Sequence, residues 1–426
     1  MKKILIITYY WPPSGGAGVQ RWLKFSKYLP EFGYEPVILT VDEKQASYAQ
    51  IDKSLLKEVS PDLAVYKTKT FEPYNLYRKL SDKKEIPYGG FSNQKKITVF
   101  EKLSRFVRGN FFMPDPRKGW NKYALKKALE LIRSEKIETV ITSGPPQSTH
   151  LIGRKIKHLT GIRWIADFRD PWTDIYYYKD LFHSPLAAAY DKKLEKKVLT
   201  EADKIITVSA EVAKLLLNKI PGSGEKIVVI PNGYDESDFD NTSNVSNDFF
   251  TIAYIGTISM SYRIGGFIDA VSQLPENIRE QMKIRFVGNV PDEILNLFQL
   301  KNLGSMVEVL GYVPHEMAVA QMVNASMLIM AIPDSPDNKG IVTGKFFEYL
   351  AAGRPILAIG PLGGDVDLLV QKCTAGKFVS YDETEKMKSY ILEIFDLYQK
   401  GTVWHETSGT DRYTRRNLTR ELTSQL

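Results

Sequence analysis

Short apolar runs alternate with amphipathic helical patterns along most of the chain. In the first half, runs rich in Ile and Val predict strands at Lys3–Thr8, Glu35–Val41, Glu138–Thr142, Arg163–Asp167, Lys204–Val208 and Ile227–Ile230. These runs are almost continuously apolar, which is typical of parallel strands covered by helices on both faces. Helical patterns stand between them, as at Gln20–Phe32 and Lys122–Ser134. The alternation predicts right-handed β-α-β units on a parallel sheet.

A polar stretch, Asp240–Asp248, interrupts this pattern and is typical of a linker. The alternation then restarts and predicts further strands at Phe250–Ile255, Ile284–Gly288, Val307–Leu310, Met327–Ala331, Ile356–Ile359 and Lys377–Val379. We therefore predict an N-terminal α/β domain over residues 1–240 and a C-terminal one over residues 249–405. A last segment, residues 406–426, is expected to form a helix that returns to the first domain.

The composition indicates a globular protein large enough for two domains. The chain has 426 residues, of which 43% are hydrophobic and 25% charged. Its single cysteine, Cys373, excludes a disulfide within the chain and favours a reducing compartment. The first apolar run ends at Trp11-Pro12-Pro13 and is too short for a signal peptide. No segment reaches the roughly 18 apolar residues of a membrane-spanning helix, so we expect a cytoplasmic protein.

The charge balance favours an anionic partner. The formal net charge is +7 and the isoelectric point is about 9.0, which suits a nucleoside diphosphate, an acidic lipid surface or nucleic acid. Nucleic-acid binding lacks a recognition motif and is not expected. The segment Gln94–Lys127 holds ten Lys and Arg residues against two acids, with several Phe residues between them. Such a segment fits either an anionic membrane face or a solvated helix with ordinary core contacts.

Ligands of parallel sheets bind at the carboxyl ends of the strands, so the loops that follow strands are candidate sites. The first such loop, Pro12–Gly18, contains Gly15 and Gly16, which allow a ligand to approach the backbone closely. Its spacing differs from the dinucleotide-binding G-x-G-x-x-G motif. The alternative interpretation is a tight turn between a strand and a helix.

A loop of the second domain offers more chemistry. Thr343 is a candidate N-cap, Gly344 exposes first-turn amides, and Lys345 adds a cation beside them. Together these groups suit a diphosphate. Glu348 follows one turn later on the same helix face and suits the two hydroxyls of a ribose. The alternative is an exposed Lys–Glu pair on a helix.

Three further features carry charge near strand ends. Arg263, in the loop Gly256–Gly266, suits a departing diphosphate or is a solvated surface arginine. Ala166–Trp172 places Arg169 and Asp170 beside aromatic residues, either for function or as a structural ion pair. His150 follows Ser143-Gly144-Pro145-Pro146 and is a ligand contact or a packing histidine. Asp365-Val366-Asp367 imitates a metal motif, but acids are favoured at a helix start without metal.

These loops together resemble the GT-B glycosyltransferases, in particular the large retaining group that includes the bacterial glycosyl group 1, or family 4, transferases. The motifs that carry the resemblance are Pro12–Gly18, Ala166–Trp172, Ile230–Asp235 and Gly344–Ile356. The resemblance implies an α/β fold of the GT-B type. In that fold two Rossmann-like domains have parallel sheets that face each other across an interdomain cleft, where the donor binds.

The resemblance also implies roles for single residues. Glu348 resembles the second glutamate of the family's E-x7-E motif, which holds the donor ribose, whereas Gly340 stands where the first glutamate belongs. The implied donor-binding residues are Gly15, Gly16, Gly256, Thr343, Gly344 and Glu348. The implied catalytic residues are Arg263, Lys345, Arg169 and Asp170, and the expected acceptor contacts are His150, Trp172 and Trp120. No metal or other cofactor is expected.

By resemblance, the reaction moves a sugar from a UDP- or GDP-linked donor to a saccharide or lipid-linked acceptor, with retention of anomeric configuration. The expected setting is the assembly of bacterial surface polysaccharide or lipopolysaccharide, with the protein attached peripherally to the inner face of the plasma membrane. Two alternatives stay open. One is a nucleotide-sugar 2-epimerase, and the other is a GT-B scaffold that binds the nucleotide-sugar without turnover, which Gly340 favours.

Overall fold

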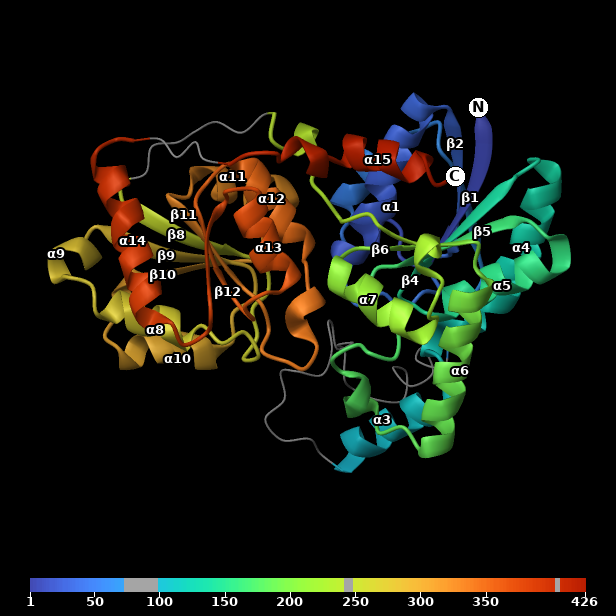
Figure 1. Ribbon diagram of the computed structural model, residues 1–426, viewed down its shortest axis with the longest axis horizontal. Helices are drawn as coiled ribbons and strands as arrows, with labels where there is room; N and C mark the ends of the chain where they lie inside the picture. Colours follow the sequence, from blue (N-terminus) through green and yellow to red (C-terminus); the bar gives the residue numbers. More distant parts are fainter. Residues whose placement is uncertain (73–98, 241–247, 403–406) are drawn as a thin grey trace. The chain divides into compact units, whose positions relative to one another are not determined.

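The computed structural model describes residues 1–72, 99–240, 248–402 and 407–426 and divides into two compact units (Figure 1). The first unit comprises Met1–Pro231 together with Arg415–Leu426, and the second comprises Asn232–Thr414. Most of the predicted linker Asp240–Asp248 lies outside the described residues, as does the beginning of the basic segment Gln94–Lys127.

The first unit contains a seven-stranded sheet in the order β3-β2-β1-β4-β5-β6-β7, in which every pairing is parallel. Its strands are β1 (Lys2–Thr8), β2 (Tyr34–Val41), β3 (Ala64–Thr68), β4 (Thr139–Gly144), β5 (Arg163–Phe168), β6 (Lys204–Thr207) and β7 (Ile227–Val229). All but β3 lie where the apolar runs predict them. The sequence analysis missed β3 because this edge strand has no fully buried residue and lacks a continuous apolar run.

Alternate residues of each strand pack on opposite faces of this sheet. In β1, Leu5 and Ile7 join one core and Ile4 and Ile6 join the other, which explains why the strand has no polar face. The helices that cover the sheet are α1 (Ala17–Tyr28), α4 (Asn121–Ser134), α5 (Ser148–Thr160), α6 (Pro185–Glu201), α7 (Ala210–Lys219) and α15 (Arg415–Thr423), with α3 (Val99–Phe111) beside them.

The helix predicted at Gln20–Phe32 is shifted in the structure. Its α-helical part, α1, begins at Ala17 and ends at Tyr28, and a 3-10 turn, η1 (Leu29–Phe32), follows. Pro30 causes the change, because it has no amide hydrogen to continue the α-helical bonding.

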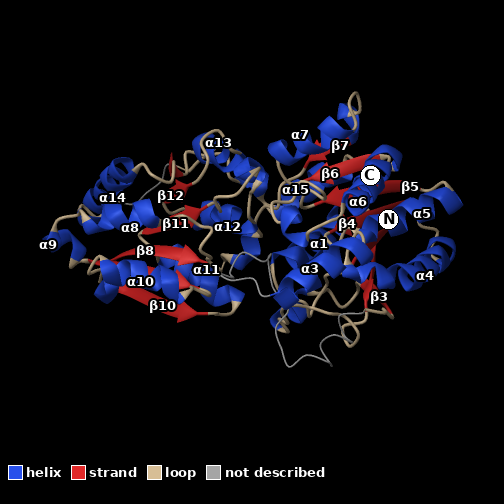
Figure 2. Ribbon diagram, turned by 90° about the horizontal axis from the view of Figure 1, so that it is seen from below, coloured by secondary structure: helices blue, strands red, loops and turns tan. Residues whose placement is uncertain are grey.

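The second unit contains a six-stranded parallel sheet in the order β10-β9-β8-β11-β12-β13. Its strands confirm all of the runs predicted after the linker: β8 (Phe250–Ile255), β9 (Met282–Val287), β10 (Val307–Gly311), β11 (Met327–Ala331), β12 (Ile356–Ile359) and β13 (Gly376–Val379). The helices are α8 (Gly265–Ser272), α9 (Glu276–Arg279), α10 (Asp292–Leu300), α11 (His315–Asn324), α12 (Gly344–Ala352), α13 (Asp365–Lys372) and α14 (Thr384–Gln399). In Figure 2 the strands of each unit lie between layers of helices.

The last helix, α15, belongs to the first unit. Leu418 and Leu422 are buried in the same core as Trp22 and Phe25 of α1. An exposed ion pair joins the Nε of Arg416 to a carboxylate oxygen of Glu31 at 2.6 Å. Within the described parts of the chain, no helix is long and apolar enough to cross a bilayer.

Shortening Leu418 to Ala should destabilise the first unit by about 2–5 kcal/mol, because the substitution leaves a cavity between α15 and α1. Urea denaturation followed by tryptophan fluorescence measures this loss. Ser424→Ala, on the exposed end of the same segment, is the matched control and should change stability by less than about 0.5 kcal/mol. Equal effects of the two substitutions would show that α15 is not part of the first unit's cooperative core.

Candidate functional site

The first turn of α12 leaves several polar groups open to a ligand. Its N-cap, Thr343, has extended backbone angles (φ −80°, ψ 153°) and makes no side-chain cap bond. The Thr343 hydroxyl is buried and has no hydrogen-bond partner among the described residues. No atom lies within 4 Å of the position that a Cβ would take on Gly344. The amide of Phe346 donates to the carbonyl of Thr343 at 3.2 Å. The amides of Gly344 and Lys345 come before the first acceptor inside the helix, so they are available to a ligand.

Lys345 places a partly desolvated cation beside that turn. Its Nζ donates to the Tyr254 hydroxyl at 3.0 Å and lies 4.3 Å from the centroid of the Tyr254 ring. Burial lowers the pKa of Lys345 to about 8. Gly256, at the end of β8, has φ +106°, and a Cβ on it would stand 3.0 Å from the Lys345 Nζ. The predicted donor-binding residue Gly256 and the predicted catalytic residue Lys345 therefore meet at the carboxyl end of β8.

Glu348 is accessible rather than packed into the interior. A quarter of its side chain is exposed, and its Oε1 lies 3.9 Å from the Nε2 of His315. The same imidazole nitrogen lies 3.3 Å from a carboxylate oxygen of Asp238. Gly340 ends a 3-10 turn, Asn338–Gly340, so no carboxylate stands at the position of the missing motif glutamate.

Arg263 is held by two carboxylates that the sequence analysis did not find. Its guanidinium donates to Asp334 at 2.9 Å and to Asp382 at 2.8 Å, and it lies over the ring of Tyr381. The hydrogen bond to Asp334 is the largest cause of its raised pKa. These acids lie 71 and 119 residues further along the chain. The charge of Arg263 is compensated in this structure, so the side chain must exchange a partner before it can contact a phosphate.

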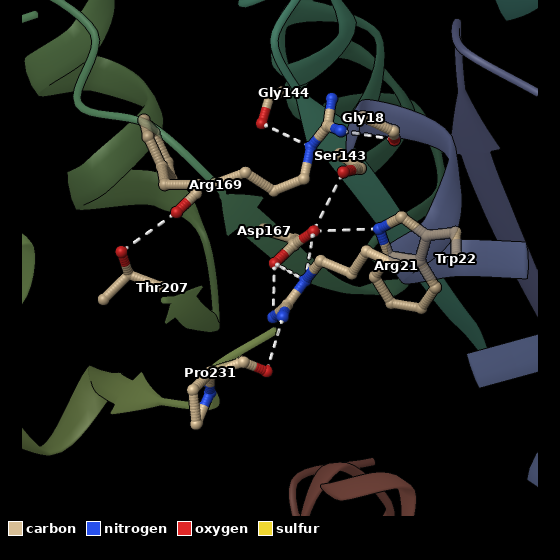
Figure 3. A network of polar contacts seen from close by, with 10 residues as sticks. Gly18, Arg21, Trp22, Ser143, Gly144, Asp167, Arg169, Thr207 and Pro231 are labelled. Carbon is tan, nitrogen blue, oxygen red and sulfur yellow. Dashed lines mark hydrogen bonds and ion pairs between the residues drawn. The ribbon is translucent and has the colours of Figure 1, made fainter. Parts of the chain in front are cut away.

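In the first unit, a buried ion pair ties the carboxyl end of β5 to α1 (Figure 3). Asp167 accepts from the Nε of Arg21 at 3.1 Å, the indole nitrogen of Trp22 at 2.8 Å and the hydroxyl of Ser143 at 2.8 Å. The Nη2 of Arg21 lies 3.0 Å from Asp167, and its Nη1 donates to the carbonyl of Pro231 at 3.0 Å. Arg21 and Asp167 are both almost completely buried.

Arg169 connects two loops through backbone carbonyls. Its Nε donates to the carbonyl of Gly144 at 3.1 Å, and its Nη1 donates to that of Gly18 (Figure 3). Its Nη2 donates to the carbonyl of Pro145. A Cβ on Gly18 would stand 2.8 Å from this guanidinium. Arg169 thus positions the glycine-rich loop against the turn after β4. Burial lowers the pKa of Arg169 and raises that of the half-buried Asp170.

Two glycines of that loop, Gly15 and Gly16, are each required by the local backbone structure, for different reasons. Gly15 donates its amide to the carbonyl of Gln50 at 3.0 Å, and a Cβ on Gly15 would stand 3.1 Å from the Gln50 side chain. Gly16 is the N-cap of α1 and has φ +89°, a backbone conformation that favours glycine. Both residues therefore hold the loop shape, and their predicted contact with the donor stays a prediction.

His150 is fully buried and neutral. Its ring stacks on Phe168 at 4.4 Å, and its Nδ1 lies 3.0 Å from the Thr142 hydroxyl oxygen. That oxygen also accepts from the indole nitrogen of Trp164 at 2.8 Å. Because a hydroxyl has one proton and two lone pairs, it can bond to either tautomer of the imidazole at Nδ1. Nε2 has no partner among the described residues. Burial lowers the pKa of His150 to about 3.

The two tryptophans expected to contact an acceptor lie in the core of the first unit. Both indoles are almost fully buried. The indole nitrogen of Trp120 donates to Thr68 at 2.8 Å, and that of Trp172 donates to Asp191 at 3.0 Å. Neither side chain is exposed to a ligand in this structure.

The acidic pair at the start of α13 is bound by protein donors. Asp367 accepts from the amide of Gly363 at 2.8 Å and from the side chain of Gln371 at 2.7 Å, and Asp365 is also buried. Within the described parts of the chain, no three His, Cys, Asp or Glu side chains gather to hold a metal ion.

Removing only the acid of the buried ion pair, by Asp167→Ala, should cost about 3–5 kcal/mol, because Arg21 would stay buried without a counter-charge. The double substitution Arg21→Leu with Asp167→Leu should cost clearly less than the sum of the single substitutions Arg21→Leu and Asp167→Leu. Denaturation of all variants closes the thermodynamic cycle. Glu130→Ala breaks an exposed pair with Lys127 and should cost less than about 1 kcal/mol. Additive single effects would rule out the coupling.

His150 should make stability depend on pH. Because the folded-state pKa is about 3 and the unfolded value is about 6.5, only the unfolded state gains this proton near pH 5. The contribution of neutral His150 to the free energy of unfolding is therefore fully present above pH 6.5 and is lost as pH falls towards 3. Between pH 7 and 5 the loss should be about 2 kcal/mol. Denaturation of His150→Asn should lack this contribution, whereas His158→Asn, an exposed control, should retain it.

Comparisons with known proteins show a partial match to one family model and a wider likeness in fold. Residues 88–238 match the family model of Glycosyltransferase Family 4. No curated protein matches the chain. Among solved structures, HepE from Anabaena in complex with UDP and glucose is 14% identical and has a TM-score of 0.63, with 100% of this chain and 99% of HepE covered.

Two other solved structures bear on the alternatives. WaaG, a glycosyltransferase involved in lipopolysaccharide biosynthesis, is 12% identical with a TM-score of 0.56, covering 99% of this chain and 98% of WaaG. A Listeria monocytogenes protein assigned as a UDP-N-acetylglucosamine 2-epimerase is 11% identical with a TM-score of 0.56, covering 100% of this chain and 95% of its own. The two parallel-sheet units therefore have the GT-B fold. Residues 88–238, almost all of them in the first unit, are similar to the Glycosyltransferase Family 4 model, and the likeness to the solved structures shows the fold of the whole chain.

Proposed function

We propose that the chain transfers a sugar, with retention of anomeric configuration, from a nucleoside-diphosphate sugar to a saccharide or lipid-linked acceptor. The observation that carries the proposal is the start of α12. There a Thr343 hydroxyl without a described partner, an open Gly344 and the Nζ of Lys345 lie together at the first turn of the helix. A helix start of this kind attracts the negative charge of a phosphate.

In the proposed reaction the bond between the anomeric carbon and the diphosphate oxygen breaks, and the acceptor oxygen bonds to that carbon. The acceptor's proton leaves with the diphosphate. Lys345 and the first amides of α12 stabilise the negative charge that develops on the leaving group. Glu348 accepts hydrogen bonds from the ribose hydroxyls, which its exposed carboxylate can reach. Arg263 contributes when it exchanges Asp382, its more exposed partner, for a phosphate.

Several predicted roles belong to the same proposal. Gly15 and Gly16 contact the donor from a loop that Arg169 holds in place, and Asp170 follows directly after that arginine. HepE has been solved with UDP and glucose and also with UDP-glucose, which supports a UDP-linked donor. The participation of WaaG in lipopolysaccharide biosynthesis supports a role in bacterial surface polysaccharide assembly, with the chain on the cytoplasmic face of the membrane.

A nucleotide-sugar 2-epimerase is the second candidate function, favoured by the fold shared with the Listeria protein. An epimerase would convert the nucleotide-sugar without any acceptor, whereas a transferase requires one. The third candidate, a scaffold, would bind nucleotide-sugars without turning them over with any acceptor. Nuclear magnetic resonance of the sugar product separates all three, and its anomeric coupling constant also reports retention.

Nucleotide affinity should depend on the charge of Lys345. A thermal-shift screen with UDP, GDP and ADP first selects the nucleotide, since a ligand of the native state raises the melting temperature. The pKa of Lys345 is about 8, so its charge is present at pH 7 and is lost as pH rises towards 9. The affinity for the selected nucleotide, measured by calorimetry, should fall up to about tenfold over this range.

The matched variants separate this charge from other causes. Lys345→Arg keeps a cation and should bind equally at both pH values, whereas Lys345→Met should bind weakly at both. Lys386→Met removes an exposed lysine of α14 and should behave as the unaltered protein does. Unchanged affinity in Lys345→Met would refute the diphosphate site at α12.

A further inference from the structure

Exposed apolar side chains gather on α3 and at the start of α6. On α3 they are Leu103, Phe106, Val107 and Phe111; near α6 they are Phe182, Leu186 and Tyr190. Leu186 is 85% exposed, Phe111 66% and Leu103 58%. We call these seven residues the α3–α6 surface. Apolar side chains that cluster in this way mark an interaction site more often than scattered ones do.

The helix α3 presents one face to the protein and the opposite face outward. Arg105 is 4% exposed, and a Cβ on Gly109 would stand 2.4 Å from the carbonyl oxygen of Leu181. Both residues therefore face inward. At 100° per residue, Leu103, Val107 and Phe111 lie on the opposite side of the helix, and Phe106 lies on its flank. All four side chains are exposed.

The two parts of the surface are joined by hydrogen bonds. The side chain of Asn110 in α3 donates to the carbonyl of Phe182 at 3.1 Å and accepts from the amide of Ser184 at 2.7 Å. Ser184 is the N-cap of α6, so the last turn of α3 is fixed against the first turn of α6. Figure 1 shows α3 beside that end of α6. The exposed apolar residues at the end of α3 therefore lie near those at the start of α6.

The outward face of α6 changes from apolar to basic along its length. Leu186, Tyr190, Lys193 and Lys197 follow one another at spacings of three or four residues and share one face of the helix. The acids of the same helix segment point inward. Asp191 binds Trp172 and Tyr178, while Glu195 binds Thr173 and Lys219.

The burial of these acids leaves positive charge on the outside of α6. Asp191 is 2% exposed and Glu195 is 1% exposed. None of the lysines beside them forms an ion pair with a described residue; they are Lys192, Lys193, Lys196 and Lys197. Lys102 adds an exposed cation on α3. An apolar area bordered by lysines matches the acyl chains and phosphates of an anionic bilayer surface.

We propose that the α3–α6 surface binds an anionic phospholipid bilayer. Its apolar side chains insert below the headgroups, and the α6 lysines contact the lipid phosphates. A protein partner fits less well, because the lysines have no acidic counterpart and extend beyond the apolar area. The biological role of this surface rests on the proposed function, because an enzyme bound to the bilayer would meet a lipid-linked acceptor in the same plane.

Vesicle sedimentation with the full chain tests the proposal. The protein should bind vesicles of mixed phosphatidylglycerol and phosphatidylcholine, bind pure phosphatidylcholine weakly, and lose binding as salt rises. Leu186→Glu and Phe111→Glu should each lower binding at least tenfold. Lys193→Gln with Lys197→Gln should lower it by about twentyfold to thirtyfold, at about fivefold for each lysine. The matched control Leu159→Glu alters an exposed leucine of α5 in the same unit and should bind as the unaltered protein does.

Thermal shifts with the selected nucleotide, measured on the same variants, separate this inference from the proposed function. All variants should keep the nucleotide shift, because none alters the donor site. Vesicle binding that fails while the nucleotide shift persists would overturn the membrane surface alone. Equal losses in Leu159→Glu and Leu186→Glu would overturn it too. If Leu186→Glu instead converts an associated form to a monomer in analytical ultracentrifugation, the surface binds a second copy of the chain and the bilayer assignment is wrong.

Discussion

The buried pair of Arg21 and Asp167 is the constraint on which the carboxyl edge of the first unit's sheet depends. It connects α1, the ends of β4 and β5, and the carbonyl of Pro231 through one carboxylate and one guanidinium. A buried ion pair adds little net stability relative to well-packed apolar residues, but a lone charge in its place is costly. The pair therefore acts mainly by fixing the positions of α1 and of the ends of β4 and β5 relative to one another. Arg169 continues this fixation through backbone carbonyls and sets the position of the glycine-rich loop.

The corresponding edge of the second unit is left chemically incomplete. Around the start of α12, Thr343 has a buried hydroxyl without a described partner, and Lys345 is desolvated against a tyrosine ring. Unsatisfied donors and a lowered pKa both cost folding free energy, so they point to a ligand that compensates them. Arg263 is different, because Asp334 and Asp382 already compensate its charge. Binding there requires an exchange of partners, whereas binding at Lys345 requires none.

The sequence predicted the fold better than the site. Continuous apolar runs located every described strand except β3, an edge strand whose half-buried residues leave only a weak pattern. The loop at α12 could be predicted because its residues are adjacent in the chain. The partners of Arg21 and Arg263 could not, since they lie far away in sequence and no local pattern records such pairings. The burial of single side chains could not be predicted either. Trp120 and Trp172 are of a residue type that suits contact with a sugar, yet the structure places both in the core.

Because burial cannot be predicted from local sequence, the basic composition alone did not show which surface of the protein is positively charged. In the sequence of α6, acids and lysines are interleaved and nearly cancel within a turn. The fold separates them, because Asp191 and Glu195 satisfy buried donors while the lysines point outward. The first of these donors is the indole of Trp172, so a tryptophan expected to contact an acceptor instead holds an acid inward. Core packing thereby creates a one-signed outer face beside the exposed apolar residues of α3.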